Sequence, residues 1–179
     1  MSKGMGNIEL KGFDEFFKEL QALEVSMDDI LQDLCRELAA RLLALVIPRT
    51  PVAETDGGTL RRGWVAQTEE DAWKNRGSIP SPTEQIDHIN KIKIARSGST
   101  YTITVTNPVH YASYVEKGHR QTPGQFVPAI GKKLKASWVK GQFFLEISEN
   151  TIKASSQKIL EKKLKAMIKQ AMKNAQSNH

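Results

Sequence analysis

The strongest constraint on the fold is a run of apolar residues over 27–47 that recur at intervals of three or four positions. This spacing gathers the side chains on one face of a helix and therefore predicts a long core helix. Ser26 is a suitable N-cap, two aspartates follow it where the helix dipole favours negative charge, and Pro48 and Pro51 stop the pattern. The periodic residues are Met27, Ile30, Leu31, Leu34, Cys35, Leu38, Leu42, Leu45 and Val46.

Further helical patterns lie towards both ends of the chain. Residues 13–23 have the spacing of a short amphipathic helix, and the sequence from about Gln142 onward predicts one long helix. The apolar stripe of that second helix consists of Ile152, Ile159, Leu160, Leu164, Met167, Ile168 and Ala171. One or two helical turns are also predicted after Tyr111, with Gly118 ending them.

Between these helices the sequence becomes β-prone. We expect strand structure over 63–68, 86–96 and 99–107, and the last of these runs alternates apolar residues with threonines. The short stretch 97–99 would join the second and third runs as a hairpin. Helices before and after a small antiparallel β-sheet define an α+β fold, in which N-terminal helices and a long C-terminal helix pack on the sheet.

The length of 179 residues suits one domain with a substantial core. We expect residues 1–150 to form this α+β domain, and residues 142–179 to form a long basic helix that begins inside it. Stretches with prolines and glycines predict mobile loops at about 50–60, 70–87 and 118–138.

The net charge of +6 is unevenly distributed along the chain. The first 150 residues carry 19 basic and 19 acidic side chains, whereas residues 151–179 carry seven lysines and one acid, Glu161. Such a charged run can be a solvated helix face, a surface for an acidic protein partner, or a track for phosphates. The protein is thus a neutral body with a basic tail.

Several classes of protein are disfavoured by composition. With 39% apolar and 26% charged residues the chain is typical of a soluble globular protein. The longest apolar run is far shorter than the roughly 20 residues that span a bilayer, and the first residues do not resemble a secretory signal. Cys35 is the single cysteine, which excludes an intramolecular disulfide and fits a reducing cytosol. Its place on an apolar helix face predicts an inert thiol.

The stretch TNPVHYASYVEKGHR, residues 106–120, concentrates the candidate chemistry of the chain. His110 and His119 are nine positions apart, which matches no zinc-binding spacing. A hydrolase centred on His110, Glu116 and His119 is the enzymatic hypothesis. The sequence nevertheless lacks a nucleophile elbow, a phosphate-binding loop and an acidic metal cluster. We therefore expect no enzyme, no cofactor and no metal.

Three segments, taken in order and at their spacing, carry a family resemblance: TPVAETDGGTLRRGW (50–64), VTNPVHYASYVEKGHR (105–120) and VKGQFFLEISE (139–149). Together they resemble the tail-completion, or head–tail joining, proteins of tailed bacteriophages and related prophage elements. The matching residues are Thr50, Pro51, Val52, Gly58, Leu60 and Arg61; Asn107, Tyr111, Ala112, Tyr114, Val115, Glu116, Gly118 and His119; and Gly141, Phe144 and Leu145. The insertion-like stretch 69–87 and the lysine-rich end depart from the family pattern.

The resemblance implies a structural virion protein of the phage neck. It implies a homo-oligomeric ring, hexameric or dodecameric, that completes the tail and joins it to the head connector. The implied partners are other copies of the chain, the head connector or adaptor, and the tail terminator or tail-tube proteins, without a membrane. The protein would lie in the host cytoplasm during assembly and in the virion afterwards.

The same resemblance suggests which residues meet a neighbour. They are Pro51, Gly58, Leu60, Arg61, Arg62, Tyr111, Tyr114, Glu116 and His119. The two tyrosines, three positions apart, would share a helix face and act as interface anchors. The arginines can fork onto carboxylates or backbone carbonyls across a subunit boundary, with Glu116 as a natural partner within or between chains. Alternatively, the tyrosines are intramolecular core and the Glu–Arg pair is a surface ion pair of about 0–1 kcal/mol.

The basic tail supports a second hypothesis, a module that binds nucleic acid without sequence preference. Its contacts with DNA, or with an acidic protein partner, would come from Lys158, Lys162, Lys165 and Lys169. The tail contains no arginine and no aromatic residue to stack on bases. For a neck protein such binding would amount to a transient contact with genomic DNA.

Overall fold

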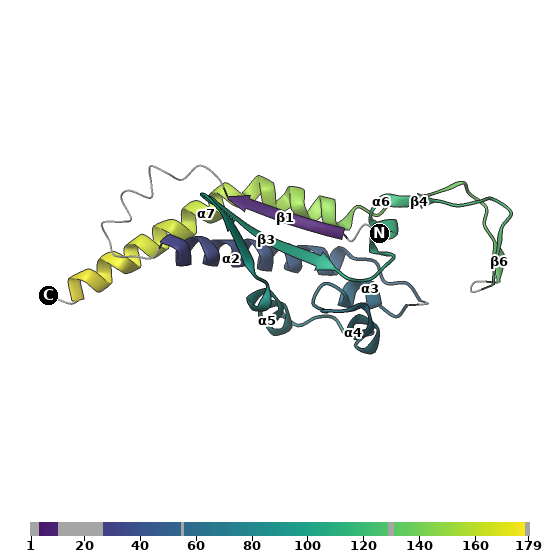
Figure 1. Ribbon diagram of the computed structural model, residues 1–179, viewed down its shortest axis with the longest axis horizontal. Helices are drawn as coiled ribbons and strands as arrows, with labels where there is room; N and C mark the ends of the chain where they lie inside the picture. Colours follow the sequence, from purple (N-terminus) through teal and green to yellow (C-terminus); the bar gives the residue numbers. More distant parts are fainter. Residues whose placement is uncertain (1–3, 11–26, 55, 129–130, 178–179) are drawn as a thin grey trace. The chain divides into compact units, whose positions relative to one another are not determined.

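The computed structural model describes residues 4–10, 27–54, 56–128 and 131–177 (Figure 1). The helix predicted over 13–23 lies outside the described residues. The chain divides into two compact units, each assembled from separate segments. Unit 1 comprises Met1–Gly4, Val46–Pro80 and Thr106–Ile147, and unit 2 comprises Met5–Leu45, Ser81–Val105 and Ser148–His179.

Helix α2, Met27–Arg49, is the core helix that the apolar periodicity predicts. It continues through Pro48 for one further residue, because a proline in the last turn removes only one of the final backbone hydrogen bonds. Its buried residues in unit 2 are Ile30, Leu31, Leu34, Cys35, Leu38, Ala39, Leu42 and Leu43. The last turn, from Val46, belongs to unit 1.

A three-stranded sheet of order β1-β3-β2 confirms the α+β fold class. Strand β1 spans Gly4–Leu10, a strand that the sequence pattern did not predict. Strands β2, Ile94–Ser97, and β3, Thr100–Asn107, form the predicted antiparallel hairpin, with Ser97 opposite Thr100. Alternate residues of β3 are buried, as the apolar–threonine alternation requires.

The predicted strand over 86–96 is wrong in its first half, which is helical. Helix α5 spans Pro82–Lys91, and Ser81 and Glu84 close a reciprocal capping box at its start. The Glu84 N–H donates to Ser81 Oγ at 3.2 Å, and the Ser81 N–H donates to the Glu84 carboxylate at 2.8 Å. With proline in the first turn, this cap commits the segment to a helix before the β-prone isoleucines begin.

The strand predicted over 63–68 is also wrong, and the expected loop over 70–87 is partly helical. Helix α3, Thr59–Arg62, occupies the first family block, and the chain then turns towards helix α4, Glu69–Lys74. Thr68 caps α4 by accepting the Asp71 N–H at 3.1 Å, and the first turn carries three acids. Polar capping therefore outweighs weak β propensity in this segment.

A long two-stranded ribbon replaces the irregular stretch expected over 118–138. It leaves helix α6, Ala112–Lys117, and lies in unit 1. At its base β4, Gly118–Arg120, pairs antiparallel with β7, Trp138–Lys140. Farther out β5, Phe126–Val127, pairs with β6, Lys132–Lys133. Figure 1 shows it projecting away from α6, and we call residues 118–140 the ribbon.

Helix α7, Phe144–Ser177, is the long C-terminal helix predicted from about residue 142. Its first residues belong to unit 1 and the remainder to unit 2, where Ile152, Leu160 and Leu164 are buried. Among the described helices, α7 included, none combines the length and apolar character that a membrane crossing requires.

Candidate assembly interface

The first family block folds around a buried threonine at the end of α2. Thr50 Oγ donates to the Val46 carbonyl at 2.7 Å and accepts the indole N–H of Trp64 at 2.8 Å. The Arg61 guanidinium donates twice to the Thr50 carbonyl, at 3.1 and 2.8 Å. Arg61, predicted to fork onto a carboxylate or a backbone carbonyl of a neighbouring subunit, here binds a carbonyl of its own chain and closes the 50–64 segment upon itself within unit 1.

Asp56 joins the first block to the second. One carboxylate oxygen accepts the Gly58 N–H at 2.8 Å, and the other accepts the Tyr111 hydroxyl at 2.7 Å. Burial, together with the Asp56 carboxylate, raises the pKa of Tyr111 above its ordinary value, so this hydroxyl stays a donor. Tyr111 is therefore a structural clamp, as the intramolecular alternative for the tyrosines predicted.

A second link between these blocks passes through Asn107, which is fully buried. Its amide nitrogen donates to the Leu60 carbonyl at 2.8 Å, and its oxygen accepts the Val109 N–H at 3.2 Å. A Cβ on Gly63 would lie 2.2 Å from that amide oxygen. Glycine is thus required at position 63 because the asparagine approaches the backbone there.

Glu116 joins the second block to the third. Its two carboxylate oxygens accept the backbone N–H groups of Leu145 and Glu146, each at 3.0 Å, in the first turn of α7. The residue is only 6% exposed, so this carboxylate caps α7 from a distant part of the chain. Within the chain Glu116 does not pair with Arg61, because both side chains have backbone partners, and its pairing with Arg62 or with a neighbouring chain stays a prediction.

Two glycines cross at the base of the ribbon, directly beside this cap. A Cβ on Gly118 would lie 2.3 Å from the Val139 carbonyl oxygen, and a Cβ on Gly141 would lie 2.3 Å from the Glu116 carbonyl oxygen. Gly118 also has a φ of 81°, which side chains rarely adopt. The glycines of the second and third blocks therefore share one function, the close passage of two backbones.

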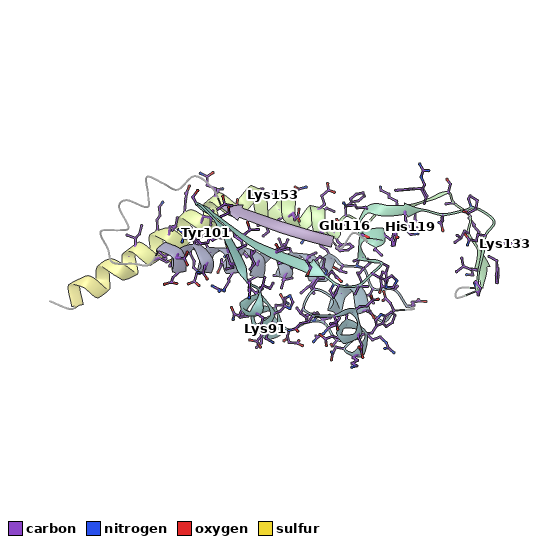
Figure 2. The ribbon with its side chains drawn as sticks, viewed as in Figure 1. Lys91, Tyr101, Glu116, His119, Lys133 and Lys153 are labelled. Atoms are coloured by element: carbon purple, nitrogen blue, oxygen red, sulfur yellow. The ribbon has the colours of Figure 1, made fainter. Side chains whose placement is uncertain are left out.

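Tyr114 and His119 remain at the surface of unit 1. Tyr114 is 55% exposed, and its ring meets the His119 ring edge to face, with centroids 5.7 Å apart. His119 Nδ1 is buried and has no hydrogen-bond partner among the described residues. Figure 2 shows His119 beside Glu116 where the ribbon begins. Of the predicted contact residues, this pair presents an aromatic face to the outside.

The remaining predicted contact residues are mixed. Gly58 and Leu60 are buried inside the first block, and Gly58 has a positive φ of 93°. Pro51 and Arg62 are partly exposed, and Arg62 reaches the Ser78 hydroxyl at 3.4 Å. The first two therefore shape the loop, whereas the latter two are accessible to a neighbour.

The hydrolase hypothesis gains no support from the geometry. His110 Nδ1 lies 2.5 Å from a carboxylate oxygen of Glu69, and this hydrogen bond is the main cause that lowers the pKa of Glu69. Glu116 caps a helix and His119 contacts Tyr114, so each of the three residues has its own structural partner. Within the described ranges no three His, Cys, Asp or Glu side chains are placed to hold a metal ion.

The four lysines predicted to contact DNA or an acidic partner form one stripe on α7, in unit 2. Lys158, Lys162, Lys165 and Lys169 are all exposed and follow one another at intervals of four, three and four residues. That spacing keeps them on one helix face. Between them, Lys163 turns to Glu37 of α2 at 3.6 Å.

The ribbon carries exposed residues that sequence reasoning passed over. Phe126 and Trp138 are 55% and 51% exposed, and Arg120, Lys132 and Lys133 are also exposed. The signal was present in the charge pattern, since residues 117–145 contain six basic side chains and no acidic one. Averaging the charge over the first 150 residues concealed it.

Comparison with known families identifies the class of protein to which this chain belongs. The family model described as "Bacteriophage HK97-gp10, putative tail-component" matches residues 14–118. Because that match covers more than half of the chain, the chain belongs to this family of tailed-phage tail components. Neither the curated proteins nor the solved structures gave a match. The matched span includes the first family block and residues 105–118 of the second, and it ends where the ribbon begins.

Proposed function

We propose that this protein is a structural component of the phage neck, where it forms a homo-oligomeric ring that completes the tail and joins it to the head connector. Membership of the phage tail-component family supports a structural tail protein. The proposal adds the ring, the neck position, and contacts with the connector or adaptor and with the tail terminator or tail tube. On this proposal the chain carries no catalytic site.

The observation that carries the ring is the concentration of exposed apolar side chains on unit 1. Among the described side chains, and leaving the ribbon aside, the exposed large hydrophobic residues of unit 1 are Val52, Ile79, Tyr114 and Ile147, whereas unit 2 has Ile86. A unit with several exposed large apolar side chains is a candidate for contact with other proteins. Tyrosine and tryptophan are the residue types that most often anchor such contacts.

The predicted contact residues then divide into two roles. Gly58, Leu60, Arg61, Tyr111 and Glu116 hold the three family blocks together and so present a rigid surface. Tyr114 and His119 form the contact itself, with Pro51 and Arg62 beside the exposed 52–54 loop.

The experiment compares Tyr114→Ala with Ile86→Ala. The two side chains are exposed to similar extents, 55% and 53%, but lie on unit 1 and unit 2 respectively. Native mass measurement and sedimentation would follow each protein alone and after mixing with purified tail tubes. We expect the wild type and Ile86→Ala to form closed oligomers on tail tubes, and Tyr114→Ala to lose most of that association.

Two outcomes would count against the proposal. A wild-type protein that stays monomeric and never joins a tail would contradict the proposed ring. Equal assembly by Tyr114→Ala and the wild type would remove the proposed contact. Because Tyr114 is half exposed, the variant should fold as the wild type does, which thermal unfolding would verify.

The lysine stripe favours a second candidate function, non-specific binding of nucleic acid. Its four exposed lysines share one helix face, as a phosphate track requires. The stripe has no aromatic residue for stacking on bases. Neutralising the stripe, in the experiment below, measures how much of any DNA binding it carries.

A further inference from the structure

Positive charge is concentrated in the ribbon and the residues that flank it, whereas the rest of the first 150 residues is acidic. Residues 117–145 hold six lysines and arginines and no acid, whereas the other residues of the first 150 hold 13 basic and 19 acidic side chains. The apparent neutrality of the first 150 residues is therefore the sum of a +6 ribbon region and a −6 remainder. The basic residues are Lys117, Arg120, Lys132, Lys133, Lys135 and Lys140.

Strand pairing places aromatic residues beside these cations. In the β4–β7 pair Arg120 lies opposite Trp138, and in the β5–β6 pair Phe126 lies opposite Lys133. Directly opposed residues of an antiparallel pair share one face of the ribbon. All four side chains are exposed, and Figure 2 shows Lys133 near the end of the ribbon farthest from Glu116. Each pair thus offers a positive charge next to a flat apolar ring.

An open hollow of about 590 Å³ lies on the ribbon. It is lined by Arg120, Gln121, Thr122, Ser137 and Trp138. These residues supply a guanidinium, hydroxyl and amide donors and one indole ring, without a carboxylate. The lining suits an anionic group with an adjoining ring or sugar, which is the chemistry of a nucleotide unit.

We propose that the ribbon binds duplex DNA, with its lysines and Arg120 on the phosphates and with Trp138 and Phe126 against sugars and bases. A two-stranded β-ribbon is one of the two elements that the major groove admits. A protein partner is the less suitable occupant, because lysine is depleted in protein–protein interfaces whereas it readily neutralises phosphate. This proposal does not depend on the ring.

The test uses two variants of the full chain that remove the same charge. The ribbon variant replaces Lys132, Lys133, Lys135 and Lys140 by glutamine, and the stripe variant does the same to Lys158, Lys162, Lys165 and Lys169. All eight lysines are exposed, so neither variant should disturb the fold, which circular dichroism would check. Fluorescence anisotropy with a short labelled duplex, between about 50 and 200 mM salt, would give each affinity and its salt dependence.

The ribbon variant should bind at least about tenfold more weakly than the wild type. The slope of log affinity against log salt should flatten by up to about 3.6, since each neutralised phosphate contributes about 0.9. The stripe variant, with an equal net charge, should change both quantities less. Equal affinity of the ribbon variant and the wild type would overturn the proposal, and so would an equal loss in both variants.

A charge-neutral variant separates apolar contact from electrostatics. Trp138→Ala should weaken DNA binding roughly tenfold without changing the salt slope, because the indole loses its apolar contact with sugars and base edges. Ile79→Ala removes another exposed apolar side chain of unit 1 and should leave the affinity unchanged. If the ribbon variants bind DNA normally but alter sedimentation, the ribbon contacts a second copy and the DNA proposal is wrong. Failure of the ring would instead be seen with Tyr114→Ala on tail tubes.

Discussion

In unit 2 the buried side chains are almost all apolar, whereas five of the six buried polar residues in the described chain lie in unit 1. Those five are Thr50, Asp56, Thr59, Asn107 and Glu116. Among the described residues exposure shows the reverse arrangement, since seven large hydrophobic side chains are exposed on unit 1 and one, Ile86, is exposed on unit 2. Unit 2 follows the usual rule that apolar side chains are buried and polar side chains are exposed. Unit 1 departs from this rule twice, because it buries polar side chains and exposes large apolar ones.

The difference indicates which kind of interaction stabilises each unit. Unit 2 relies on apolar burial, which is tolerant of detail and follows from periodicity. Unit 1 relies on specific hydrogen bonds and close backbone passages that connect its three family blocks. A buried hydrogen-bond network costs stability when one of its members has no partner. We therefore expect such a network where a surface must be held rigid. Unit 1 is accordingly the unit to which we assign assembly.

The largest expected effect comes from the glycine crossing in unit 1. Gly118→Ala should destabilise the protein by about 3 kcal/mol or more, because backbone strain at positive φ adds to a clash with the Val139 carbonyl. Gly124→Ala is the matched control, since Gly124 has a φ of 86° and nothing within 4 Å of an added Cβ. It should cost only about 1 kcal/mol. Urea unfolding measures both, and equal losses would mean that the crossing is not tight.

A smaller loss is expected from the cap on α7. Glu116→Ala should cost about 2 kcal/mol, because two backbone N–H groups in the first turn lose a buried, charged acceptor. Glu146→Ala removes an exposed carboxylate from the same turn and should cost about 0.5 kcal/mol or less. Hydrogen exchange at Leu145 and Glu146 should rise in the first variant alone. Unchanged protection there would show that the cap does not hold the helix start.

Sequence reasoning succeeded where one physical signal repeats over many residues. The apolar periodicity over 27–47 and from about 142 predicted α2 and α7, because burial of a helix face leaves its period in the sequence. It failed over 86–91, where the Ser81–Glu84 capping box decides the conformation with two hydrogen bonds. It also missed β1, a strand whose sequence lacks strict alternation and which pairs with β3 across the chain.

The sequence indicated which residues belong to the candidate site, but it did not indicate their hydrogen-bond partners. The family resemblance selected Tyr111 and Glu116 as contact residues, a role that stays a prediction, and the structure shows both making hydrogen bonds inside unit 1. Their partners, Asp56 and the first turn of α7, lie 55 and 29 positions away or more, and only the folded chain brings them together. Charge complementarity suggested an Arg–Glu pair instead, because residue types alone do not show which backbone donors and acceptors the fold brings to each side chain.

The smallest expected effect lies in unit 2 and tests whether the polar contacts of Asp28 contribute to stability. Asp28 accepts the Tyr101 hydroxyl at 2.6 Å and pairs with Arg96 at 2.9 Å. The Tyr101 hydrogen bond is the main cause that holds the pKa of Asp28 below its ordinary value of 3.8. A depressed carboxylate pKa contributes stability that is fully present above the unfolded value and is lost as the pH falls through the folded value.

The penalty of Asp28→Asn should therefore be largest at neutral pH and should shrink as the pH falls below 3.8. Asp33→Asn removes an exposed carboxylate from the same helix, 3.7 Å from Arg36, and controls for the change in net charge. Urea unfolding of both variants and the wild type across this pH range gives the difference directly. A penalty for Asp28→Asn that does not change with pH would mean that the Tyr101 contact contributes no charge-dependent stability. The contrast with unit 1 would then be sharper than this contact suggests.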